Sequence, residues 1–142
     1  MIVLDTNVIS EPLRPAGDPR VREWLNAQSP ETLYTTAINI AELLAGVERL
    51  PPGKRRRELD ARLRAGLSRV FQGRILLFDL SAAEAYARIA GHSKLAGKLV
   101  PHDDALIAAV ARAHSFAVAT RNVAHFLAAG VDVINPWNAA AG

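Results

Sequence analysis

Apolar residues recur along this chain with two spacings, one typical of buried strands and the other of amphipathic helices. Five short apolar runs predict strands, and between them apolar residues return every three or four positions, as on one face of a helix. The runs predict strands over 1–4, 32–36, 75–78, 116–120 and 131–134. The longer periods predict helices over 7–13, 18–28, 38–50, 54–71, 81–95, 105–114 and 122–129. Strands that alternate with helices indicate an α/β fold, in which a mostly parallel five-stranded sheet carries helices on both faces.

Local signals set the expected helix ends. Asp18 followed by Pro19 is typical of a helix start, with the carboxylate as cap and proline in the first turn. Residues 39–42 (NIAE) and 81–84 (SAAE) each fit a capping box, in which the first and fourth side chains bond each other's backbone N–H groups.

Composition predicts a single domain over 1–142. The 142 residues can bury a core of Ala, Leu and Val, and aromatic residues are few. The chain has no Cys, which excludes disulfides and thiolate metal sites and favours a reducing, cytoplasmic setting. No basic leader or long apolar segment accompanies the first strand, so we expect neither export nor a membrane span.

The basic residues are mostly arginine. The net charge is +3, and 14 of the 17 basic residues are Arg. The guanidinium fork suits phosphate recognition, although charge alone leaves a phosphate-bearing partner open. The run at 54–57 (KRRR) favours a solvated helix start over an RNA contact. Arg14 and Arg121 lie nearer the expected crevice and are better candidates for binding phosphate.

Acids follow or precede several expected strands. Asp5 ends the first strand, Glu42 lies early in the helix after the second, and Asp103 and Asp104 begin the helix before the fourth. If the first strand is central, all of these places border one crevice at the carboxyl edge of the sheet. Taken singly, each acid also fits a helix cap or a favourable contact with a helix dipole.

Taken together, the acids predict a metal site. Like charges at about 4 Å repel by several kcal/mol near a protein surface, so converging carboxylates need a cation between them. Without Cys, the natural choice is a hard ion such as Mg²⁺ or Mn²⁺. A metal that acidifies water and neutralises phosphate charge predicts hydrolysis of phosphodiester bonds.

Four groups of residues extend this picture over nearly the whole chain. They are residues 4–12 (LDTNVISEP); residues 41–43 (AEL) with Thr36 upstream; Asp104 with residues 107–109 (IAA); and residues 119–122 (ATRN) with Phe126 and residues 135–137 (NPW). In this order and at these separations they resemble the PIN-domain ribonucleases, in particular the VapC and FitB-like toxins of bacterial toxin–antitoxin pairs.

The resemblance implies a PIN fold with the first strand central. It implies a Mg²⁺- or Mn²⁺-dependent endoribonuclease that uses water to cleave RNA, and a cognate antitoxin of the VapB or FitA kind. It also implies a homodimer or a hetero-oligomer with that antitoxin. Asp5, Glu42 and Asp104 match the family's principal acids, which are catalytic and would hold the metal. The residues that match polar groups lining the site, or that stand where they could contact the ligands or the substrate, are Thr6, Asn7, Thr120, Arg121 and Asn122.

One departure from the family concerns a fourth acid. Many relatives carry it directly after Thr-Arg or three residues later, where this chain has Asn122 and His125. Neither residue brings a negative charge, which makes a second bound metal less favourable. Asn122 could bond a water or a carboxylate, or cap the helix that follows it.

Other functions stay open or are disfavoured. The missing fourth acid leaves a non-catalytic RNA- or protein-binding PIN domain as the alternative. A phospho-accepting receiver domain would need paired acids after the first strand and a lysine after the last. A haloacid-type phosphotransferase would need a second Asp at position 7, which is Asn7 here. Leucines on the helices at 38–50 and 54–71 could belong to the core, to a partner groove or to a dimer face.

Overall fold

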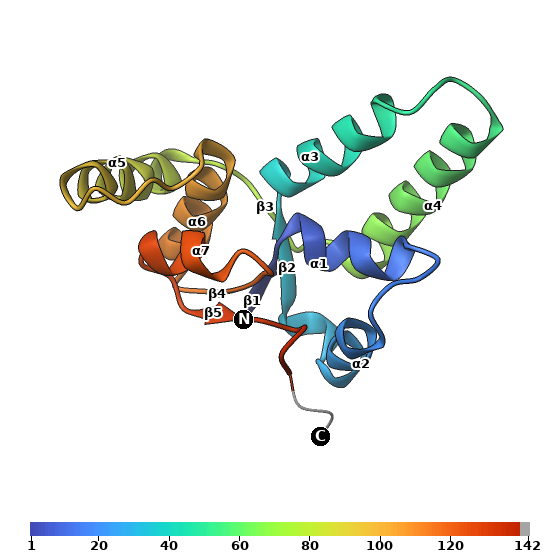
Figure 1. The fold of residues 1–142 in the computed structure, drawn as a ribbon, viewed down its shortest axis with the longest axis horizontal. Helices are drawn as coiled ribbons and strands as arrows, with labels where there is room; N and C mark the ends of the chain where they lie inside the picture. The colour runs from blue at the N-terminus through green and yellow to red at the C-terminus, as the bar shows by residue number, and fades with distance from the viewer. Residues whose placement is uncertain (140–142) are drawn as a thin grey trace.

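A computed structural model describes residues 1–139, and all five strands lie in one parallel sheet with β1 at its centre (Figure 1). The order is β3-β2-β1-β4-β5. The strands are β1 (Ile2–Leu4), β2 (Leu33–Thr36), β3 (Ile75–Leu76), β4 (Ala117–Ala119) and β5 (Val133–Ile134). Val3 is in register with Tyr34 on one side and Val118 on the other. The predicted parallel sheet with a central first strand is confirmed.

Helices cover both faces of the sheet. They are α1 (Thr6–Ser10), α2 (Pro19–Ala27), α3 (Ala37–Glu48), α4 (Lys54–Val70), α5 (Leu80–Leu95), α6 (His102–His114) and α7 (Val123–Ala128). Two single 3₁₀ turns, η1 (Glu11–Leu13) and η2 (Pro30–Thr32), join the early elements. Figure 1 shows α5, α6 and α7 on one side and α1 to α4 on the other. Within the described residues, no helix is both long and apolar enough to cross a bilayer.

Each face of the sheet has its own apolar core. Val3 and Leu4 point to opposite faces, as successive strand residues do, and so they belong to different clusters. Val3 packs with Ile107 and Phe126 beneath α5 to α7. Leu4 packs with residues of α1 to α4 and with the buried Trp137. The strand ends, which lie between these two cores, are therefore packed by helices on both faces of the sheet.

The structure corrects several predicted boundaries. The 7–13 helix is α1 followed by the turn η1, where Pro12 cannot continue the α-helical hydrogen bonds. The predicted strand at 75–78 is shorter, because only residues 75 and 76 pair with β2, at Thr35 and Thr36. The predicted strand at 131–134 likewise shrinks to Val133–Ile134.

Two predicted capping boxes were wrong. Helix α3 is capped by Thr36 and Asn39, whose side chains bond each other's backbone N–H groups, so Glu42 is not part of the cap. Helix α5 starts earlier than predicted, with Asp79 accepting from Ala82 N, and not at 81–84. In each case a suitable side chain upstream takes the capping position, three residues earlier in α3 and two residues earlier in α5.

Of the other two expected helix caps, one is confirmed and one is wrong. Asp18 caps α2 with Pro19 in the first turn, as predicted. Pro101 holds the cap position of α6, so Asp103 lies in the first turn of α6 and does not cap it.

Candidate active site

The carboxyl ends of β1, β2 and β4 meet at one edge of the sheet. Asp5 directly follows β1, Thr36 is the last residue of β2, and Thr120 directly follows β4. The backbone N–H of Asp5 donates to the carbonyl of Ala119 at 2.9 Å, which carries the β1–β4 pairing up to the acid. Side chains from segments that are distant in sequence are thereby brought together.

Asp5 is buried, with 3% of its surface exposed, and three donors satisfy its carboxylate. Its Oδ1 accepts from the Thr6 backbone N–H at 2.8 Å and from Asn39 Nδ2 at 3.1 Å. Its Oδ2 accepts from the Thr120 hydroxyl at 2.7 Å. Burial raises the pKa of Asp5 above its ordinary value; the hydrogen bonds from these residues oppose that rise, and the charge of Asp104 adds to it.

Asn39 contacts Asp5 in a way that the sequence did not predict. It is fully buried, and its Oδ1 accepts from the Thr36 hydroxyl at 2.6 Å. Its Nδ2 donates to Asp5 Oδ1 and also to Thr6 Oγ1, both at 3.1 Å. The only sequence signal was its place early in a helix after a strand, which predicted a cap and gave no contact with Asp5.

Glu42 lies on α3 one turn after Asn39, and like Asn39 it contacts Thr6. Thr6 Oγ1 donates to Glu42 Oε1 at 3.3 Å. Burial, followed by the charges of Asp5, Asp103 and Asp104, raises the pKa of Glu42 to about 7, against the lowering effect of the Thr6 bond. Glu42 can therefore gain and lose a proton near neutral pH, as a catalytic base must.

Asp104 projects from the first turn of α6. Its charge acts on both Asp5 and Glu42. Its Oδ2 lies 2.7 Å from Nδ1 of His125, which α7 supplies. The sequence predicted no contact for His125, which stood out only as a position without the expected acid.

The other predicted residues differ in how they reach the site. The Asn122 backbone N–H donates to Thr120 Oγ1 at 2.9 Å, so Asn122 braces the Thr120 hydroxyl through its backbone. Its side chain makes no capping bond to α7. Asn7 Oδ1 accepts from the Arg121 backbone N–H at 3.3 Å. The Arg121 guanidinium lies over the Trp137 ring, 5.2 Å from its centroid.

Within residues 1–139, no group of three or more acidic, histidine or cysteine side chains is placed to hold a metal ion by itself. The donor set still fits a hard divalent ion, because Mg²⁺ keeps several waters and binds through one or two carboxylates. Charge repulsion also contributes to the raised Glu42 pKa, and a bound cation would relieve it.

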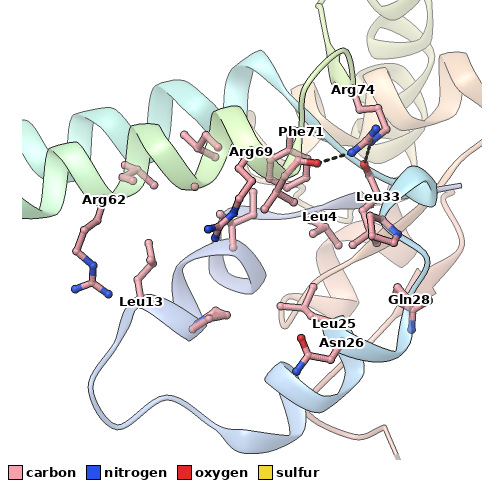
Figure 2. A pocket seen from close by; sticks show the side chains of 17 residues that line it. Leu4, Leu13, Leu25, Asn26, Gln28, Leu33, Arg62, Arg69, Phe71 and Arg74 are labelled. Atoms are coloured by element: carbon pink, nitrogen blue, oxygen red, sulfur yellow. Dashed lines mark hydrogen bonds between the residues drawn. The ribbon is translucent and has the colours of Figure 1, made fainter.

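Two adjoining hollows lie on the side of the molecule that α1 to α4 form, and one of them reaches Glu42. One, of about 500 Å³, includes Thr6 and Glu42 in its wall and is flanked by Arg14, Arg55 and Arg62. The other, of about 470 Å³, is lined mainly by apolar residues of β1, η1, α2 and α4 (Figure 2). Leu13, Arg62 and Leu63 line both. A continuous surface thus leads from Glu42 to an apolar groove on the α4 side of the molecule.

Comparison with known proteins gives consistent similarities. The family model described as "PIN domain" matches residues 2–130. The "VapC ribonuclease Y4jK" of Sinorhizobium fredii is 48% identical over 140 residues, which are 99% of this chain and 100% of that protein. "Toxin FitB" of Neisseria gonorrhoeae is 48% identical over 138 residues, which are 97% of this chain and 99% of that protein. The solved structure of FitAcB from Neisseria gonorrhoeae aligns with a TM-score of 0.94 and 47% identity, covering 98% of this chain and 100% of that one.

Proposed function

The chain belongs to the PIN-domain family, and from that premise we propose that it is a Mg²⁺- or Mn²⁺-dependent endoribonuclease and the toxin of a toxin–antitoxin pair. The observation that carries the catalytic part is that Glu42 is partly buried beside Asp5, Asp103 and Asp104: burial first, and then the charges of these acids, raise the Glu42 pKa to about 7. The names of the relatives, a VapC ribonuclease and a toxin, support the same activity.

Asp5 and Asp104 would hold the metal, directly or through water. When bound, such an ion supplies positive charge to the phosphate oxygens and acidifies water. Asp5 is suited to this because Asn39 and Thr120 fix both of its oxygens. A carboxylate whose orientation is set in advance loses little freedom on binding.

Glu42 would take the proton of the attacking water. Its Oε1 is bonded by Thr6, which leaves Oε2 to accept that proton. Since water attacks the phosphorus, and not the 2′-hydroxyl of the RNA, the products carry a 5′-phosphate and a 3′-hydroxyl. Arg14 and Arg62 line the hollow beside Glu42 and would contact the RNA backbone.

The partner would be a small antitoxin that covers this surface. The groove in Figure 2 offers apolar contacts from Leu13, Leu25 and Leu67, and α4 adds Arg62 and Arg69 along its wall. An antitoxin segment with apolar side chains and a few acids would complement it. Because the groove adjoins the hollow at Glu42, such a segment would also block the path of RNA to the acids.

Cleavage of RNA by the purified protein tests the proposal. We expect cleavage with Mg²⁺ or Mn²⁺, none with EDTA, and 5′-phosphate ends on the products. Asp5→Asn keeps the shape of the side chain and should abolish cleavage while leaving the circular dichroism spectrum unchanged. Full activity in EDTA or in Asp5→Asn would overturn it. Tight RNA binding without cleavage under any metal would favour the non-catalytic alternative.

A further inference from the structure

His125 contacts Asp104, a proposed metal ligand, from a different helix. Its Nδ1 lies 2.7 Å from Asp104 Oδ2. The side chain of Asp104 is 13% exposed and that of His125 is 43% exposed, so the carboxylate is largely shielded from water while the imidazole is partly open to it. An ionised carboxylate only accepts hydrogen bonds, so Nδ1 carries the hydrogen and donates it.

Packing, and not chance side-chain position, sets the distance between the two residues. Helices α6 and α7 lie against each other, and the guanidinium of Arg112 on α6 donates to the Ala129 carbonyl at the end of α7 at 3.2 Å. Phe126, next to His125, is fully buried in the core beneath α6. The imidazole is therefore held against the first turn of α6 by the fold itself.

We propose that His125 is a positioning residue, whose hydrogen bond to Asp104 Oδ2 would leave Oδ1 free to hold a metal, and that the site would hold one divalent ion. The inference rests on the proposed function. Metal-ligating carboxylates are commonly oriented by a hydrogen bond from an outer partner, and loss of that partner weakens metal binding. A neutral donor in place of a fourth carboxylate also removes the negative charge that a second ion would require.

Calorimetric titration of Mn²⁺ into the metal-free protein tests this without using catalysis. The wild type should bind one equivalent, and Asp104→Asn should show the loss expected of a ligand. His125→Ala should bind Mn²⁺ about 10- to 100-fold more weakly, the usual cost of removing such a partner. His125→Asn should keep most of the affinity, because its amide can donate from the place of Nδ1. His125→Asp restores a fourth acid and should bind a second equivalent.

RNA cleavage adds a second readout. In His125→Ala, kcat should return toward the wild-type value as the Mn²⁺ concentration is raised. The variant would bind the metal less tightly, but its catalytic groups would be unchanged. Thermal unfolding of the metal-free variants should match that of the wild type.

The outcomes separate the two proposals. A wild type that binds Mn²⁺ with an unaffected His125→Ala would overturn the role of His125 and leave the proposed function intact. An Asn variant as weak as the Ala variant would also overturn it, since Nε2, and not Nδ1, would then be the working atom. A wild type that binds no Mn²⁺ would remove the proposed function and this inference with it.

Discussion

Asn39 Nδ2 lies 3.1 Å from Asp5 Oδ1 and ties the acid at the end of β1 to the first turn of α3. Asn39 is itself fixed by Thr36, the cap of that helix. Thr36 and Asn39 thus both cap a helix and orient the buried carboxylate of Asp5. Changes that spare the helix but remove the amide donor should therefore affect the site.

Asn39→Asp should destabilise the protein and abolish cleavage. The substitution replaces a donor by a carboxylate that faces Asp5 in a buried place. A buried group left without its partner costs about 1–3 kcal/mol, and repulsion between like charges adds to that. Urea unfolding measures the first effect and RNA cleavage the second. Asn39→Ser, which keeps a capping side chain, separates the two roles: it should retain the helix and still lose cleavage.

Thr120→Val should shift the acidic limb of the pH–rate profile to higher pH. The Thr120 hydroxyl donates to Asp5 Oδ2 at 2.7 Å and lowers the pKa of that carboxylate. Valine has the same shape without the donor, so the pKa of Asp5 rises further and its ionised form is reached later. Thr120→Ser keeps the hydroxyl and is the control. A profile for the valine variant that overlays the wild type would contradict this account of Asp5.

The metal-free protein should lose stability as pH rises from about 4.5 to about 7. The folded-state pKa of Glu42 is raised from 4.5 to about 7, so in this range the folded protein keeps a proton that the unfolded chain has released. The contribution of Glu42 to stability is fully present below its pKa in the unfolded chain, 4.5, and is lost as pH rises through its pKa in the folded protein, about 7.

The measurement is thermal unfolding in EDTA across that range. After a discount for the partial exposure of Glu42, the effect is about 1 kcal/mol, or about 2–4 °C in Tm. Glu42→Gln should flatten the curve, and added Mg²⁺ should raise Tm most at the upper end. A Glu42→Gln curve as steep as the wild type would exclude Glu42 as the source.

Gly17→Ala should destabilise the turn that follows α1. A Cβ at position 17 would lie 2.3 Å from the Glu11 carbonyl oxygen, so the backbone must move. The shift would also strain the bond from Asp18 N to the buried Glu11 carboxylate, which is 2.9 Å long. Overpacking of this kind costs about 1–3 kcal/mol.

Gly91→Ala is the matched control for that substitution. Gly91 lies inside α5 with nothing near its Cβ, and alanine there should stabilise by about 0.5–1 kcal/mol. Chemical unfolding of both variants compares them. A neutral Gly17→Ala would show that the turn relaxes without cost.

The fold was predictable because its signals are local and repeated. Short aliphatic runs after helical periods predicted five strands in the right places, and the βα alternation predicted a parallel sheet. Strand ends were less predictable, because Leu77 and Phe78 are apolar but exposed beyond β3. Whether Leu77 and Phe78 extend β3 depends on how far β2 runs beside them, and their own sequence does not indicate that.

The candidate site was only partly predictable. Asp5, Glu42 and Asp104 were expected from their places at strand and helix ends, and the structure couples all three electrostatically. Their catalytic and metal-binding roles stay predictions. Asn39 and His125 were missed as contacts because both act across the fold, over 34 and 21 positions of sequence. Spacing reveals neighbours on one helix, but not partners on another element.

The bond between Thr120 and Asp5 spans 115 positions, and it bears on how the cell makes this protein. Because synthesis runs from the N-terminus, Asp5 leaves the ribosome 115 residues before Thr120. A nascent chain that lacks α6, β4 and α7 has neither β4, which pairs with β1, nor Asp104. The edge of the sheet that carries Asp5, Glu42 and Asp104 can therefore assemble only after α6, β4 and α7 have been synthesised.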